Sequence, residues 1–258
     1  MAEWNPALYR RFEDERTRPA RELLAWVPLE TARFAVDLGC GPGNSTELLV
    51  GRFGAPAVVG VDNSPAMLDS ARQRLPSVRF DAADIAAWVP DTPPDLIYAN
   101  AALQWVPGHE ELIPRLFALL APGGVLAVQM PDNRDEPSHR AMREVAALPP
   151  YADAMDDVHA LRSSILPLAA YYDLLAPAAA VVDVWHTVYQ HPMASPEAIV
   201  EWVSATGLKP FVERLPEALR PGYLAAYTDR IAAHYPLRAD GRRLLAFPRM
   251  FIVARRAP

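Results

Sequence analysis

Cysteine is nearly absent from this 258-residue chain, in which Cys40 is the single example. One thiol excludes an internal disulfide framework and suits a reducing compartment. Long apolar runs are also missing: no stretch approaches roughly 18 uninterrupted apolar residues, so we expect no membrane-spanning helix. The first residues are polar and mixed in charge, without the apolar centre of a secretory signal. Together these features predict a cytoplasmic protein.

An excess of basic residues is missing as well, because the formal net charge is −6. Neutralising phosphate groups requires a basic surface, so this charge disfavours a nucleic-acid partner. Hydrophobic residues make up 51% of the chain and charged residues 22%, which is the ordinary balance of a folded globular domain. The 27 prolines are spread along the whole sequence, so we interpret them as punctuation between elements.

Short apolar runs and helical segments alternate between residues 30 and 130. This rhythm is typical of βαβ units, so we predict an α/β fold with a parallel sheet and helices on both faces. The predicted strands cover residues 34–38, 57–61, 78–81, 96–99 and 124–130. Helices are expected at residues 7–25, 45–53, 64–75 and 110–120.

The pattern changes after residue 130. Residues 137–176 and 195–246 are mainly helical in character, whereas residues 181–190 and 250–256 have strand character. We therefore expect a single domain over residues 1–258. Its core sheet would span about residues 30–130, completed by the two later strands, and the two helical regions would form a cap over the carboxyl edge of the sheet.

A glycine-rich segment follows the first predicted strand and has the sequence Asp37-Leu-Gly-Cys-Gly-Pro-Gly-Asn-Ser-Thr46. Glycines between a strand and a helix let the backbone turn sharply and let a ligand lie against it. The spacing matches neither the dinucleotide fingerprint nor the phosphate loop, and the segment has no lysine. An acidic, lysine-free loop favours a ligand with a cationic group and no pyrophosphate, such as S-adenosylmethionine (SAM). Asp37 would then face the sulfonium and ammonium charges of SAM.

Two further acids stand at the ends of the next strands. Asp62 ends the second predicted strand, where a carboxylate can accept hydrogen bonds from both hydroxyls of a ribose. Asp84 follows the third strand and could accept from an adenine amino group, with the Ile85 backbone amide facing a ring nitrogen. Each acid alone also fits a structural role, Asp62 as a helix cap and Asp84 as a turn residue. The order and spacing of all three acids favour a ligand site.

At this point the motifs resemble the class I SAM-dependent methyltransferases, and within them the trans-aconitate 2-methyltransferase family. The resemblance covers nearly the whole chain. Its most specific segments are the Leu-Gln-Trp-Val run within Asn100-Ala-Ala-Leu-Gln-Trp-Val106 and the segment Gln129-Met-Pro-Asp-Asn133. The C-terminal segment Leu245-Ala-Phe-Pro-Arg-Met-Phe-Ile-Val-Ala254 also resembles that family. The resemblance implies a Rossmann-like sheet whose last strand is antiparallel. It also implies transfer of a methyl group from SAM to one carboxylate of trans-aconitate.

The chemistry of such a reaction limits what the site must contain. A carboxylate is already ionised at neutral pH, so it needs no general base, no nucleophilic residue and no metal. Holding the two reactants in line supplies about 7–11 kcal/mol instead. We interpret Cys40 as a small residue packed against the sheet. A polycarboxylate does need cationic partners, and arginine offers a two-pronged fork for a carboxylate.

The expected cofactor-binding residues are Arg16, Asp37, Gly39, Gly41, Asp62, Asn63, Asp84, Ile85 and Asn100. The candidates for the substrate site are Gln104, Trp105, Arg134, His139, Lys209 and Arg249. In this fold class the loop with Gln104 and Trp105 faces the methyl group, and Arg16 on the first helix would close over the methionine end of SAM.

Three other interpretations remain open at this stage. The acceptor could be another small acid or a phenol. The chain could also be a SAM-binding regulator without activity, although the intact set of acids and glycines disfavours a decayed site. An NAD-dependent oxidoreductase would have a different glycine spacing.

Overall fold

A computed structural model describes residues 13–155, 165–204 and 207–258, with side chains at the N-terminal end from Thr17 onward. These residues fall into two compact units. The sheet unit consists of Asp14–Pro131, the described part of Ser163–Thr187, and Arg249–Pro258. The helical unit consists of the described parts of Met1–Glu13, Asp132–Arg162 and Val188–Pro248. The expectation that the chain forms one domain stays a prediction, and each unit is described here by itself.

The sheet unit begins with helix α2 (Glu13–Ala25) and then alternates strand and helix. Its elements run β1 (Ala35–Leu38), α3 (Asn44–Phe53), η1 (Ala55–Ala57), β2 (Val58–Asp62), α4 (Pro65–Arg74), β3 (Arg79–Ala82), β4 (Leu96–Asn100), η2 (Leu103–Trp105), α5 (His109–Ala118), β5 (Val125–Pro131) and α7 (Leu168–Leu175). Each predicted strand in this stretch is present within one or two residues of its expected bounds. The short apolar runs were therefore a sufficient signal for the βαβ core.

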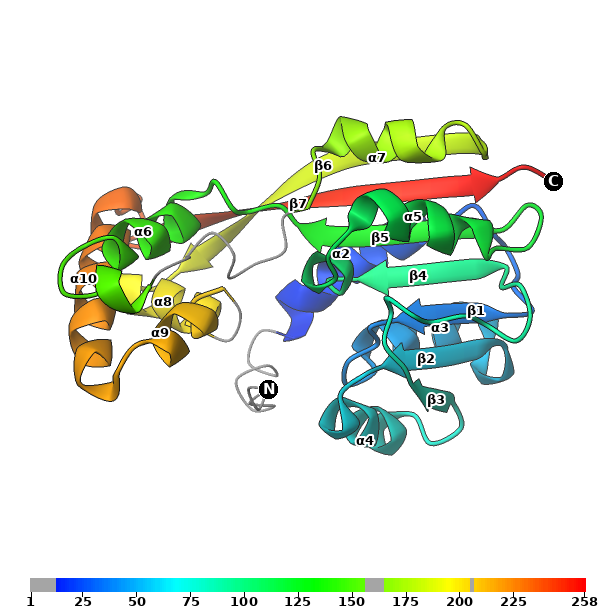
Figure 1. Cartoon of the computed structure of the whole chain (residues 1–258), viewed down its shortest axis with the longest axis horizontal. Coiled ribbons are helices and arrows are strands. Elements are labelled where there is room, and N and C mark those ends of the chain that lie inside the picture. The colour runs from blue at the N-terminus through cyan, green and yellow to red at the C-terminus, as the bar shows by residue number, and fades with distance from the viewer. Residues whose placement is uncertain (1–12, 156–164, 205–206) are drawn as a thin grey trace. The chain divides into compact units, whose positions relative to one another are not determined.

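Seven strands form the sheet in the order β3-β2-β1-β4-β5-β7-β6, as Figure 1 shows for its successive ribbons. The first five strands are parallel to their neighbours, and β7 (Arg243–Arg256) is antiparallel to β5. The mostly parallel sheet with an antiparallel last strand is thus confirmed. Strands β6 (Ala179–Met193) and β7 contribute residues to both units.

The helical unit contains α6 (Pro137–Ala146), η3 (Ala152–Ala154), α8 (Pro196–Ser204), α9 (Lys209–Arg214), η4 (Glu217–Leu219) and α10 (Arg220–His234). Its own apolar core includes Met142, Trp202, Tyr223 and Tyr227. One expected boundary was wrong: residues 243–246 belong to β7, which begins before Met250. Alternation of apolar and polar residues is weak there, because nearly every residue of the strand from Leu245 onward is buried or half-buried.

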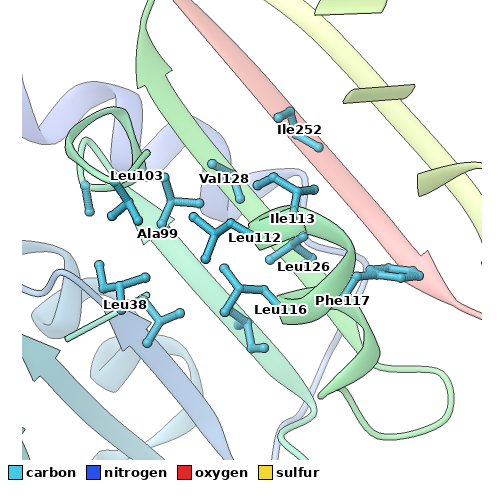
Figure 2. Close-up of a cluster of buried hydrophobic side chains, with 14 of the residues drawn as sticks. Leu38, Ala99, Leu103, Leu112, Ile113, Leu116, Phe117, Leu126, Val128 and Ile252 are labelled. Carbon is cyan, nitrogen blue, oxygen red and sulfur yellow. The ribbon is translucent and has the colours of Figure 1, made fainter. Parts of the chain in front are cut away.

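One face of the sheet in the sheet unit packs against α5, as Figure 2 shows. Leu112, Ile113, Leu116 and Phe117 of this helix lie on side chains from the central strands, and all four are buried. The spacing of these apolar residues places them on one side of the helix. The central strands are held rigidly from this side, so their carboxyl ends can position polar groups with little freedom.

Candidate functional site

The glycine turn between β1 and α3 depends on backbone conformations that favour glycine. Gly39, Gly41 and Gly43 have positive φ angles of 74°, 53° and 91°. At Gly39 a Cβ atom would lie 2.3 Å from the Cβ of Ala102, whereas at Gly41 it would meet nothing within 4 Å among the described residues. Gly39 therefore allows the turn to touch the loop that follows β4, and no described residue fills the side of Gly41.

Asp62 fixes this turn from the end of β2. One of its carboxylate oxygens accepts from the Gly41 backbone amide at 2.9 Å, and the other accepts from the Ser64 amide at 2.9 Å. Each oxygen keeps a second lone pair, so the half-buried carboxylate can still accept from ribose hydroxyls. Asn63 beside it is exposed. Ser64 is the N-cap of α4, as expected, but its side chain makes no cap hydrogen bond, and its backbone amide donates to Asp62.

Asp37 lies inside the turn and is fully buried. Its Oδ2 atom accepts hydrogen bonds from the hydroxyls of Ser45 and Thr46, both at 2.7 Å. Its Oδ1 atom has no hydrogen-bond partner among the described residues. Burial raises the pKa of Asp37 to about 6, the two hydroxyls oppose that rise, and the charge of Asp62 adds a little to it. The carboxyl is therefore mostly ionised at neutral pH and has one oxygen ready for a cation.

The loop after β3 holds the pair expected at the adenine. Asp84 is exposed, and its Oδ1 atom accepts from the Ala86 amide at 2.9 Å, which is a turn contact. Ile85 is buried, and its carbonyl accepts from Arg115 at 2.8 Å. Arg115 also donates to the Trp88 carbonyl at 2.8 Å. Nothing in the sequence indicates this role of Arg115, because the two segments are about thirty residues apart.

A row of polar side chains crosses the ends of the central strands. Asn100 at the end of β4 is in register with Gln129 on β5. Gln129 is fully buried, and its Oε1 atom accepts from Nη1 of the buried Arg249 on β7 at 3.2 Å. Gln129 begins one of the segments that resemble the family, but its residue type alone predicts no role for it. The available signal was a polar residue inside an otherwise apolar strand.

The segment after β4 carries Gln104 and Trp105 in η2. Gln104 is buried; its Nε2 atom donates to the Ala101 carbonyl at 2.7 Å, and its Oε1 atom has no partner among the described residues. Trp105 keeps 40% of its surface exposed. Ala101 has a φ of 53°, a left-handed conformation that is rare outside glycine, so the chain turns abruptly at this point.

A buried histidine anchors the same segment. His109 Nε2 is 2.9 Å from the Leu103 carbonyl, and its Nδ1 is 2.5 Å from the Tyr171 hydroxyl. A carbonyl can only accept, so Nε2 carries the hydrogen and Nδ1 accepts from the tyrosine. The Leu166 amide in turn donates to the Tyr171 hydroxyl at 3.1 Å. This chain of bonds ties η2 to α5 and α7.

The remaining candidates belong to the helical unit or lie outside the described side chains. His139 is buried, and its Nδ1 is 3.1 Å from the Ser138 hydroxyl. A Cβ on Gly207 would come within 2.7 Å of its Nε2 atom, so this ring is closely packed. The Nζ atom of Lys209 lies 3.7 Å from Oε1 of Glu213. Arg134 is exposed. The side chain of Arg16 is outside the described residues, and the expected roles of all these residues stay predictions.

Cys40 lies in the glycine turn but points into an apolar cluster with Leu68, Ala71 and Phe80. It is buried, and burial raises the pKa of its thiol far above the usual range. A thiol that stays protonated is a poor nucleophile. The packing role predicted for this residue agrees with that environment.

Within the described part of the chain, no helix is long and apolar enough to cross a membrane.

The strand order, the antiparallel β7 and the glycine turn at the end of β1 define a Rossmann-like class I methyltransferase fold. A family model described as a methyltransferase domain matches residues 35–124. Trans-aconitate 2-methyltransferase of Paracidovorax citrulli is 72% identical over 259 residues and covers 100% of both chains. The protein of the same name from Variovorax paradoxus is 69% identical and covers 99% of both. The chain therefore belongs to the trans-aconitate 2-methyltransferase family.

Solved structures agree on the fold. The YcgJ protein from Bacillus subtilis has a TM-score of 0.58 at 12% identity, covering 93% of this chain and 99% of its own. A phosphoethanolamine N-methyltransferase from Haemonchus contortus, solved with S-adenosylhomocysteine, has a TM-score of 0.55 at 16% identity and covers 93% of this chain and 53% of its own. Identities this low establish a shared fold and nothing more.

Proposed function

We propose that this chain transfers the methyl group of SAM to a carboxylate of trans-aconitate, giving the monomethyl ester and S-adenosylhomocysteine. The observation that carries the proposal is full-length identity of 72% and 69% to two relatives named for that activity. The glycine turn and the acidic strand ends are consistent with it, because they suit a cationic nucleoside without a pyrophosphate.

The residues at the strand ends fit SAM in four places. Asp37 offers a cationic group a buried carboxylate oxygen that has no partner within the described residues. Asp62 keeps acceptor capacity for the ribose hydroxyls, and the open side of Gly41 leaves room for the ligand. Asp84 and the Ile85 amide are the proposed contacts of the adenine, and Asn100 borders the methionine end. When bound, SAM supplies an electrophilic methyl group on its sulfonium.

The chain's own contribution is positioning. An ionised carboxylate needs no proton removed, so Gln104 and Trp105 serve to confine the two reactants and exclude water. Among the cationic candidates, Arg249 is the best supported, because it is buried beside the row of polar groups at the strand ends. Arg134, His139 and Lys209 are proposed as further contacts of the remaining carboxylates. The cytoplasmic location inferred from the single cysteine stays a prediction.

The test is mass spectrometry of the products formed from SAM and a panel of small acids and phenols. We expect trans-aconitate to gain one methyl group and S-adenosylhomocysteine to appear in equal amount. Methylation of phenols but not of acids would contradict the proposal. Binding of SAM without any product would favour a regulator instead, and calorimetry with NAD in place of SAM would reveal an oxidoreductase.

A further inference from the structure

The side chain of Gln129 lies on one face of the sheet with four other polar side chains. Partners in a parallel register point to the same face, so Gln129 shares its face with Asn100, and Asp37 shares its face with Tyr98. Tyr98 and Asn100 are two residues apart on β4, and side chains two apart on a strand point to the same face. The two pairs therefore share one face of the sheet. The bond from Arg249 extends the row onto β7. The polar groups thus follow one another across β1, β4, β5 and β7.

Hydrogen-bond acceptors lie at one end of this row of polar groups and donors at the other. At the β1 and β4 end, Asp37 Oδ1 and Asn100 Oδ1 are acceptor atoms without partners among the described residues. On β5, the donor Nε2 of Gln129 has no acceptor within the described part of the chain, and on β7 the row ends with a guanidinium. The acceptor half suits a cation and the donor half suits an anion. A methyl transfer from a sulfonium to a carboxylate brings together one ligand of each kind.

Arg249 also determines which way the Gln129 amide faces. A guanidinium has donors only, so it requires the oxygen of the amide, and the observed bond goes from Nη1 to Oε1. The amide nitrogen must then point away from Arg249. A buried amide nitrogen without an acceptor is unfavourable, and a ligand oxygen would supply the acceptor that the described residues do not.

We propose that Gln129 Nε2 donates a hydrogen bond to a carboxylate of the acceptor substrate, and that Arg249 holds the amide in the orientation that makes this possible. The proposal deepens the function proposed above and rests on it. Gln129 is a substrate-binding residue in this scheme, and Arg249 is at least a positioning residue through its bond to Oε1.

The test compares Gln129→Glu with Gln129→Met. The glutamate keeps an oxygen for Arg249 but replaces the donor with a second oxygen, which would repel a carboxylate. The methionine keeps the length and loses the donor. Both variants lose a hydrogen bond to a charged carboxylate, so we expect the KM for trans-aconitate to rise about 10- to 100-fold in each. The rise should be larger in the glutamate variant. The Kd for SAM from calorimetry should stay within about twofold of wild type. The matched control is Gln190→Glu, the same change at an exposed position of β6, and its KM should not change.

Two outcomes would overturn the inference: a wild-type KM in both variants, or a loss of SAM affinity as large as the rise in KM, which would indicate a structural amide. The two proposals fail differently. If the wild-type chain methylates none of the acids in the panel, the proposed function fails and this inference fails with it. If the wild-type chain methylates an acid and the variants do so with the same KM, only the assignment of Gln129 fails.

Discussion

Gly39 and Gly41 offer a matched pair of substitutions that separates backbone strain from steric overlap. Both residues have positive φ angles, 74° and 53°, so alanine is strained at either position. Only at Gly39 does the new Cβ meet another atom closely, the Ala102 Cβ at 2.3 Å. The difference between Gly39→Ala and Gly41→Ala therefore measures the contact between the glycine turn and the loop after β4.

The magnitudes follow from the geometry. A left-handed backbone costs alanine about 1–2 kcal/mol, which is the whole effect expected for Gly41→Ala on the free energy of unfolding. Two carbon atoms prefer a separation of about 3.5–4 Å, so relieving the overlap at Gly39 requires a shift of about 1 Å or more. Overpacking of this kind adds about 1–3 kcal/mol, giving about 2–5 kcal/mol for Gly39→Ala. A displacement of about 1 Å near the reacting groups also lowers the rate by about a hundredfold.

Urea unfolding and methyl-transfer assays of both variants provide the measurement. The double variant Gly39→Ala/Ala102→Gly is the decisive control, because the Ala102 Cα would lie at a tolerable 3.5 Å from the new Cβ. The double variant should recover the part of the unfolding free energy that Gly39→Ala loses through overpacking. Its stability should then resemble that of Gly41→Ala. Equal losses in the two single variants, or no recovery in the double variant, would refute the reasoning.

Three further substitutions and one addition test other parts of the site. Arg249→Ala should raise the KM for trans-aconitate by at least about tenfold and leave the Kd for SAM unchanged; an unaltered KM would remove it from the substrate site. Tyr171→Phe should lower the free energy of unfolding by about 1–3 kcal/mol in a denaturant titration, because the Nδ1 of His109 and the Leu166 amide lose their partner. A metal chelator should leave the rate unchanged, and inhibition reversed by added metal would contradict the mechanism. Asp37→Asn should weaken SAM binding at neutral pH and remove its dependence on pH near 6, as calorimetry at several pH values would show.

The sheet was predictable because its signal is local. Apolar runs such as Leu96–Asn100 and Val125–Pro131 are short, buried and bounded by turns, and these properties are readable along the chain. The glycine turn was predictable for the same reason. The antiparallel direction of β7 came only from the resemblance, since strand direction depends on connections and not on composition.

The hydrogen-bond partners in the site were not predictable from the sequence. Gln129 and Arg249 are 120 residues apart, and their bond exists because β5 and β7 pair in one particular register. Asp37 was expected to face the ligand directly, and the structure adds that Ser45 and Thr46 hold its other oxygen. A carboxylate in a motif does not reveal how deeply it is buried, because burial depends on elements elsewhere in the chain.

The pH dependence expected for Asp37 follows from that burial. Its pKa in the folded chain is about 6 against a usual value of 3.8, so between these values the folded state binds the proton more readily than the unfolded state. Raising the pH from about 4 to 6 should therefore weaken this carboxyl's contribution to folding by about 2 kcal/mol, out of about 3 kcal/mol over the whole titration, since one pKa unit corresponds to about 1.36 kcal/mol. SAM binding should change in the opposite direction, because a cation needs the ionised form and its affinity should fall as the pH drops below about 6. Asp37→Asn should remove both the pH dependence of stability and the pH dependence of SAM affinity. If the variant lost only one of the two, Asp37 would act only in the fold or only on the ligand.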